Sequence, residues 1–268
     1  MKRTIYRLMA LLVTVSVFFA ACTKEDPDVK LDPKLSTSQL SNITSDGATL
    51  TGFVIAAGSG VVEKGIVYNT SPKPTIANSK AVYTGESNGA TFPVTLTGLN
   101  YATKYYACSY ATLEDGNTIY GEEFNFTTLP VVPTVNTAAV TEIAGKSASC
   151  GGMVMVTGGA VIAKQGVCWS TKPNPTIADS KTENGNASGP YVSVLTDLKG
   201  KTTYYVRAYA TNSAGTGYGP EVIFTTLVAV PDLTTNAATN IGASGATSGG
   251  KITADGGAAI TAKGVCWS

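Results

Sequence analysis

The chain repeats itself at intervals of about 100 residues. The segment KGIVYNTSPKPTIANSK (64–80) returns as KQGVCWSTKPNPTIADSK (164–181) and begins again as KGVCWS (263–268). In the same way, LTGLNYATKYYACSYA (96–111) returns as LTDLKGKTTYYVRAYA (195–210). A period of this length predicts one globular domain per repeat, because solenoid repeats are only about 20–50 residues long.

These periods divide the chain into repeat 1 (32–129), repeat 2 (130–227) and an incomplete repeat 3 (228–268). Short segments that contain proline join the repeats. Repeat 3 stops inside what should be its third strand, so we expect the sequence to be a fragment of a longer protein. About forty residues cannot complete the core of a sandwich. We therefore predict a disordered, protease-sensitive tail that begins near Leu227, with a strand near 246–254, a turn at 255–257 and the start of a strand at 265–267.

Within each repeat the apolar residues recur with a period of two. In the run from Tyr204 to Ala210, one face carries Tyr204, Val206, Ala208 and Ala210, and the other carries Tyr205, Arg207 and Tyr209. This alternation is typical of a half-buried antiparallel strand. Turns rich in Gly, Asn and Asp separate further strands, which we expect at 36–43, 47–55, 63–69, 91–96, 103–112 and 119–127. Six or seven short strands in about 100 residues predict an all-β antiparallel sandwich.

A more specific signal lies at 195–215, where the pattern L…L…T-x-Y-x-V-R-A-Y-A-x-N-x-x-G resembles the sixth-strand motif of fibronectin type III domains. The GVCWS…PNPTI segment of repeat 2 resembles the variant common in surface proteins of Bacteroidetes. This resemblance implies tandem immunoglobulin-like (fibronectin type III-like) β-sandwiches. It also implies that Tyr105 and Tyr204 are tyrosine-corner residues, whose hydroxyls bond to the backbone upstream. Repeat 1 departs from the pattern by having Cys108 where repeat 2 has Arg207.

The first 22 residues have the features of a lipoprotein signal peptide. Three basic residues precede an apolar run at 8–21, which is too short to span a bilayer comfortably. The run ends in Ala20-Ala21-Cys22, which resembles a bacterial lipobox, although Phe19 replaces the usual leucine. We therefore predict that Cys22 carries acyl chains such as palmitate, which anchor the protein stably. The alternative is an ordinary secretory signal in which Cys22 is incidental.

Residues 23–31 form a polar tether that contains the sequence TKEDPD. A lysine followed by acidic residues at this point resembles the surface-export signal of Bacteroidetes-type lipoproteins. The alternative is that any such tether is charged because it must stay solvated. We expect a protein of the cell envelope, anchored in the outer membrane by its lipid and exposed on the cell surface.

Composition excludes several kinds of chemistry. The chain has no histidine, which removes the commonest acid-base group and the commonest zinc ligand. Without its leader the chain has a net charge of about −2, so it lacks the basic field that binds nucleic acid. We interpret Glu122-Glu123 and Glu114-Asp115 as solvated charges, with a calcium site as a remote alternative. No catalytic residue, metal ligand or cofactor is predicted.

The cysteines and tryptophans admit two interpretations each. Cys168 occupies the position of Val67, and Cys150 that of Leu50, so both indicate packing sites for small hydrophobic side chains. A Cys150–Cys168 disulfide remains open, because an oxidising compartment permits it. Trp169 is expected in the core, with an aromatic platform for carbohydrate as the alternative.

These features predict a non-catalytic interaction, adhesion or spacer protein that is tethered to the membrane by its lipid. Its ligand, if it has one, would be an extracellular protein or glycan. The alternative is the N-terminal, non-catalytic part of a larger surface enzyme, for example a glycan-degrading one. Residues that recur in each repeat serve the shared fold. We therefore expect a binding site where the repeats differ, in the turns at 56–62, 84–90, 113–118 and 184–190.

The segment GTGYG (215–219) is interpreted as a hairpin turn rather than a phosphate-binding loop, since no helical pattern follows it.

Overall fold

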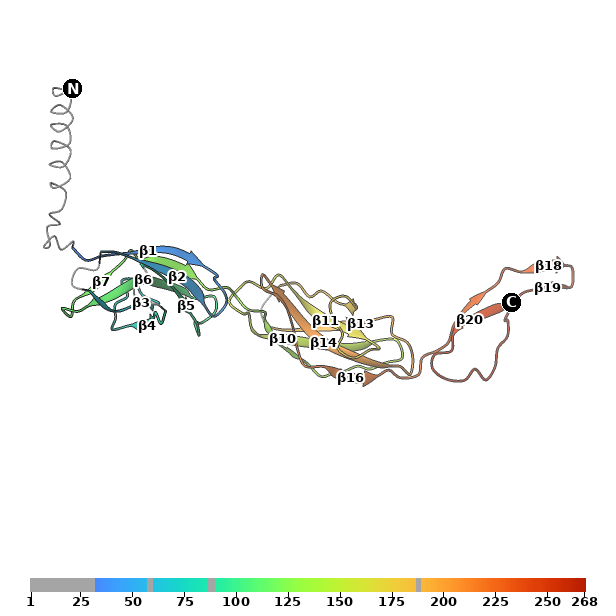
Figure 1. Ribbon diagram of the computed structural model, residues 1–268. Helices are drawn as coiled ribbons and strands as arrows, with labels where there is room; N and C mark the ends of the chain where they lie inside the picture. The colour runs from blue at the N-terminus through green and yellow to red at the C-terminus, as the bar shows by residue number, and fades with distance from the viewer. Residues whose placement is uncertain (1–31, 57–59, 86–89, 187–188) are drawn as a thin grey trace, which may run out of the picture. The chain divides into compact units, whose positions relative to one another are not determined.

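The computed structural model describes residues 32–56, 60–85, 90–186 and 189–268 (Figure 1). Every regular element in this part of the chain is a β-strand, and the strands pair in antiparallel ladders. The all-β prediction is therefore confirmed. None of the described residues belongs to a helix long and apolar enough to span a bilayer. The signal peptide and the tether lie outside the described residues.

The strands of repeat 1 form two sheets. One has the order β1-β2-β5, and its strands are β1 (Lys34–Ser41), β2 (Ala48–Ala56) and β5 (Thr91–Leu96). The other has the order β4-β3-β6-β7, and β8 also pairs with β6. Its strands are β3 (Val61–Asn69), β4 (Ser79–Val82), β6 (Lys104–Leu113), β7 (Thr118–Tyr120) and β8 (Phe124–Thr127). The six predicted strands are all present, although the predicted strand at 119–127 is divided into β7 and β8, and β4 was not predicted.

Repeat 2 also forms two sheets. The first has the order β13-β10-β9, with β9 (Thr134–Thr137), β10 (Ala148–Val156) and β13 (Pro190–Leu195). The second has the order β12-β11-β14-β15, and β16 also pairs with β14. Its strands are β11 (Lys164–Ser170), β12 (Ser180–Lys181), β14 (Thr203–Asn212), β15 (Gly215–Tyr218) and β16 (Val222–Thr225). The GTGYG segment is thus mostly strand β15, and the hairpin turn lies just before it. This corrects the prediction of a turn.

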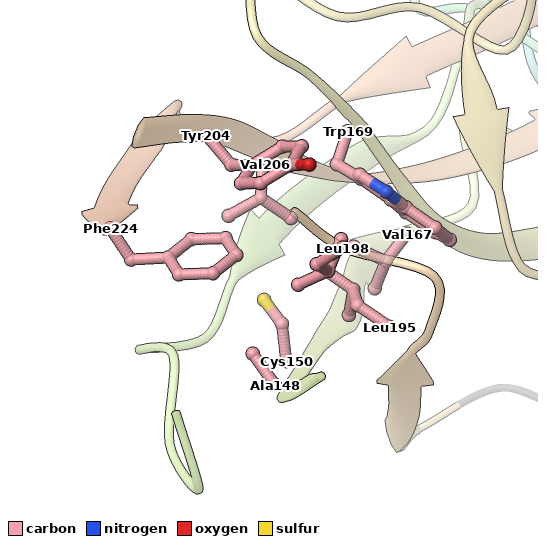
Figure 2. Packing of buried hydrophobic residues seen from close by; sticks show 9 residues of the cluster. All are labelled: Ala148, Cys150, Val167, Trp169, Leu195, Leu198, Tyr204, Val206 and Phe224. Carbon is pink, nitrogen blue, oxygen red and sulfur yellow. The ribbon is translucent and has the colours of Figure 1, made fainter. Parts of the chain in front are cut away.

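A core of buried side chains from both sheets lies at the centre of repeat 2 (Figure 2). Strands β10 and β13 contribute Ala148, Cys150 and Leu195, and strands β11, β14 and β16 contribute Val167, Trp169, Tyr204, Val206 and Phe224. Two sheets that bury their inner faces against each other in this way are consistent with a β-sandwich.

The predicted alternation along β14 is confirmed for its inward face, where alternate residues from Tyr204 to Ala210 are buried. The outward face differs from the prediction at Tyr209, which is also fully enclosed. Tyr209 lies opposite Gly166 in the ladder between β11 and β14, and its hydroxyl donates to the Thr182 carbonyl at 2.7 Å. Because Gly166 has no side chain, the tyrosine ring lies across its backbone. A Cβ at Gly166 would lie 3.0 Å from that ring.

Repeat 3 forms two small antiparallel pairs and contributes nothing to the buried hydrophobic core. Strand β17 (Asp232–Thr235) pairs with β20 (Gly250–Ala254), and β18 (Thr239–Gly242) pairs with β19 (Gly245–Thr247). The predicted strand at 246–254 corresponds to β19 and β20, and Asp255 accepts a hydrogen bond from Gly257 in the predicted turn. The prediction of a strand at 265–267 is wrong. These residues have no strand partner, and Trp267 is 90% exposed.

Candidate functional site

The two predicted corner tyrosines have equivalent surroundings. The Tyr204 hydroxyl accepts a hydrogen bond from the backbone N–H of Lys199 at 3.0 Å, and the Tyr105 hydroxyl accepts one from Asn100 at 3.1 Å. The Tyr204 ring is stacked on Phe224 of β16, the strand that pairs with β14. The Tyr105 ring is stacked on Phe126 of β8, the strand that pairs with β6. These contacts hold the connection that precedes β14 or β6, so both tyrosines serve the fold. Cys22, the predicted lipidation site, lies outside the described residues.

The cysteines at 108, 150 and 168 are free and buried. Cys150 lies in the core between the sheets together with Val167 and Trp169. Because successive side chains of a strand point to opposite faces, Cys168 points away from that core. Its thiol lies 3.5 Å from the Pro175 carbonyl. Cys150 and Cys168 are therefore on opposite sides of β11 and form no disulfide. Burial raises the pKa of each of the three thiols to about 11, which keeps them protonated.

A proline-containing loop covers the outward face of the larger sheet in both repeats. In repeat 2 the loop carries Pro-Asn-Pro-Thr-Ile at 173–177, and in repeat 1 Pro-Lys-Pro-Thr-Ile at 72–76. Glu221 accepts a hydrogen bond from the N–H of Asn174, which has a φ of 58°. The Tyr218 hydroxyl accepts a hydrogen bond from Ile177 at 3.1 Å. The loop is thus held at two points, by the last residue of β15 and by the residue just before β16.

The equivalent loop of repeat 1 is held in the same way. Glu123 accepts a hydrogen bond from Lys73, which has a φ of 59°, and Tyr120 accepts one from Ile76. The pair Glu122-Glu123 is therefore more than the solvated charge that the sequence predicted. Hydrogen bonds from its own backbone N–H, from the Thr37 N–H and from the Ser36 hydroxyl hold the pKa of the Glu122 carboxyl below its usual range. Each carboxylate fixes a backbone segment.

One surface pocket of repeat 2, about 500 Å³ in volume, lies beside the proline-containing loop at 173–177. Trp169 and Tyr204 form its aromatic wall, and the charged groups around it are Asp179, Asp197 and Lys181. Further hydroxyl side chains line the pocket, namely Ser170, Thr171, Ser180 and Thr196. The strand ends of β11 and β12 and the turn after β13 bring these residues together. The pocket is thus mostly polar, with two aromatic residues in its lining.

Trp169 is only 9% exposed and belongs to the core, as the sequence predicted. Figure 2 shows its indole packed with Val167 and the leucines of the core. No described residue accepts a hydrogen bond from the indole N–H, and this nitrogen is not among the enclosed polar atoms without a partner. Because so little of the indole is exposed, it offers no broad flat platform for a ligand.

Repeat 1 lacks the two carboxylates of this pocket. Asn78 stands at the position of Asp179, Gly98 at that of Asp197, and Tyr68 at that of Trp169. Asp197 has a φ of 58°, in the left-handed region that glycine adopts most easily, and Gly98 has a φ of 72°. Repeat 2 therefore places a carboxylate at a backbone position where glycine would be less strained.

The ion pairing of the lysine at the edge of this pocket also differs between the repeats. In repeat 1, Lys80 forms an ion pair with Glu63 at 2.7 Å. Lys164 of repeat 2 stands at the position of Glu63 and pairs instead with Glu183. Lys181, which corresponds to Lys80, donates only to the Ile177 carbonyl among the described residues. Its ammonium group is consequently left at the edge of the pocket without a carboxylate partner.

The side chains that line this pocket can form hydrogen bonds and ion pairs. Within the described part of the chain, no group of three or more His, Cys, Asp or Glu side chains is close enough together to hold a metal ion. The sequence predicted a binding site in four turns, and the pocket lies in none of them. The signal that could have found it is the contrast between the repeats at 78 and 179 and at 98 and 197. No protein-family model matches the chain, and no curated protein is significantly similar to it.

Proposed function

We propose that this chain is a non-catalytic protein of the cell envelope, anchored by acyl chains on Cys22, whose fibronectin type III-like repeats form an interaction or spacer module. The anchor rests on the basic start, the apolar run and Ala20-Ala21-Cys22. The module rests on one observation above all. Repeats 1 and 2 build corresponding pairs of sheets, in corresponding strand order, with the same tyrosine contact and the same doubly held loop.

Shared internal contacts support this role for a physical reason. The hydrogen bonds that recur in both repeats fix turns and loops to the strands beneath them, which makes each repeat a self-contained unit. A series of such units suits the display of a binding surface away from the membrane. The fibronectin type III-like identity is supported by the hydrogen bonds of Tyr105 and Tyr204 to upstream backbone.

Acyl labelling tests the proposal. The full chain with a C-terminal epitope tag is expressed in a Gram-negative host that is fed labelled palmitate. We expect the wild-type chain to be labelled and to enter the membrane fraction, with its tag open to antibody on intact cells. Cys22→Ala should abolish the label and leave the chain unprocessed or released. Cys266→Ala, which changes an exposed cysteine elsewhere, is the matched control and should keep the label. A Cys22→Ala chain that is processed and retained in the membrane would refute the anchor.

A further inference from the structure

We propose that the pocket of repeat 2 beside Trp169 binds a saccharide that carries no acidic group. This inference deepens the interaction role proposed above by naming the class of ligand. It depends on the pocket alone, so its failure would leave the lipid anchor untouched.

The polar lining of the pocket suits the hydroxyl groups of a sugar. Each sugar hydroxyl both donates and accepts a hydrogen bond. The Asp179 and Asp197 carboxylates can only accept, whereas the Lys181 ammonium and the Trp169 indole can only donate. Four serine and threonine hydroxyls that line the pocket can do either. A ligand with several neighbouring hydroxyls can add hydrogen bonds to such a mixed set, whereas an apolar ligand would cover its charged members without adding any.

The charge of the pocket excludes acidic sugars. Two carboxylates and one ammonium leave the site with a net negative charge. A uronic or sialic acid would bring a like charge into contact with Asp179 or Asp197, and such repulsion is a common basis of specificity. Neutral sugars avoid this repulsion, and amino sugars gain an attraction.

Three differences from repeat 1 indicate that these groups serve something other than the fold. Asn78 does the structural work of Asp179, because each accepts a hydrogen bond from the threonine N–H three residues earlier, at 2.9 Å and 2.8 Å. Gly98 takes the same turn as Asp197 without a side chain in the left-handed region. The ion pair that engages Lys80 is absent at Lys181. Repeat 2 therefore carries charges that this fold does not need.

Tryptophan fluorescence of the full chain tests the proposal. The chain has two tryptophans, and Trp267→Phe leaves Trp169 as the only one, at the pocket itself. The probes are neutral hexasaccharides of gluco, manno and galacto configuration, chitosan hexasaccharide and hexagalacturonate. We expect saturable changes in Trp169 emission with at least one neutral or amino probe at up to millimolar concentration, and none with hexagalacturonate.

Two variants restore the residues of repeat 1. Asp179→Asn keeps the turn, as Asn78 shows, and Asp197→Gly relieves the left-handed backbone. Each should weaken binding about ten-fold or more, because each removes a charged hydrogen-bond acceptor. The thermal midpoint should stay the same or rise. Asn78→Asp in repeat 1 is the matched control and should leave the affinity unchanged. The proposal is overturned if no neutral or amino probe saturates, if hexagalacturonate binds as well, or if both pocket variants bind like the parent chain.

Discussion

Removal of the Tyr204 hydroxyl, by Tyr204→Phe, should destabilise repeat 2 by about 1–2 kcal/mol. The side chain is almost fully enclosed, and its hydroxyl accepts the Lys199 N–H at 3.0 Å. The substitution takes away this acceptor and leaves the donor unpaired, which costs about 1–3 kcal/mol where the donor is buried. Lys199 itself is exposed, so water can partly replace the hydroxyl and the lower part of that range applies. The phenyl ring keeps its packing on Phe224, at 5.7 Å between ring centroids.

The change can be measured by calorimetry on the full chain. For a domain of about 100 residues, 1 kcal/mol lowers the midpoint by roughly 4–8 °C. Tyr205→Phe is the matched control, because Tyr205 is half-buried on the opposite face and its hydroxyl has no partner among the described residues. It should shift the midpoint far less. Tyr105→Phe should instead affect the transition of repeat 1, since Tyr105 holds Asn100. Equal shifts for Tyr204→Phe and Tyr205→Phe would refute the assignment of the two faces of β14.

A thiol reagent should modify the exposed Cys266 at once. The buried Cys108, Cys150 and Cys168 should react only when the protein unfolds. Burial raises the pKa of these three thiols from 9.0 to about 11, so unfolded thiols ionise first as the pH rises. The contribution of these thiols to the free energy of unfolding should therefore be constant below pH 9 and should fall between about pH 9 and 11. Denaturant unfolding at a series of pH values measures this change, and a free energy of unfolding that does not fall in that window would contradict the burial of the thiols. In repeat 3, amide exchange over 246–267 should be fast, because this segment contributes nothing to the buried core. Strong protection there in a monomer would show that repeat 3 folds, and the repeat boundaries would have to be redrawn.

The strands could be predicted from sequence because their alternation is a local property. A half-buried strand needs apolar residues at every second position, and the run from Tyr204 to Ala210 has them. Strand β4 could not be predicted, since its four residues Ser79–Val82 are mostly exposed and show no apolar alternation. Tyr209 was assigned to the outward face because no local pattern shows that Gly166, 43 positions earlier, makes room for its ring.

No local motif marked the candidate site, for the same reason. Asp179 and Asp197 belong to different turns, and neither forms a recognisable motif with its neighbours. The expectation from the sequence was instead that a site would lie in the turns where the repeats differ. Glu123 was likewise interpreted as a solvated charge, because the backbone N–H that donates a hydrogen bond to it belongs to Lys73, 50 residues away.

What the sequence by itself determined is therefore the all-β class, the positions of most strands, and the inward face of β14. These follow from residue periodicity, which each strand carries within its own few residues. Only the tertiary structure decided which distant groups meet: the hydroxyl of Tyr209 with the Thr182 carbonyl, the carboxylate of Glu221 with Asn174, and the charges around Trp169. Such meetings depend on how strands are ordered in a sheet and how two sheets face each other. That order is set by the packing of the whole domain, and no short stretch of the chain records it.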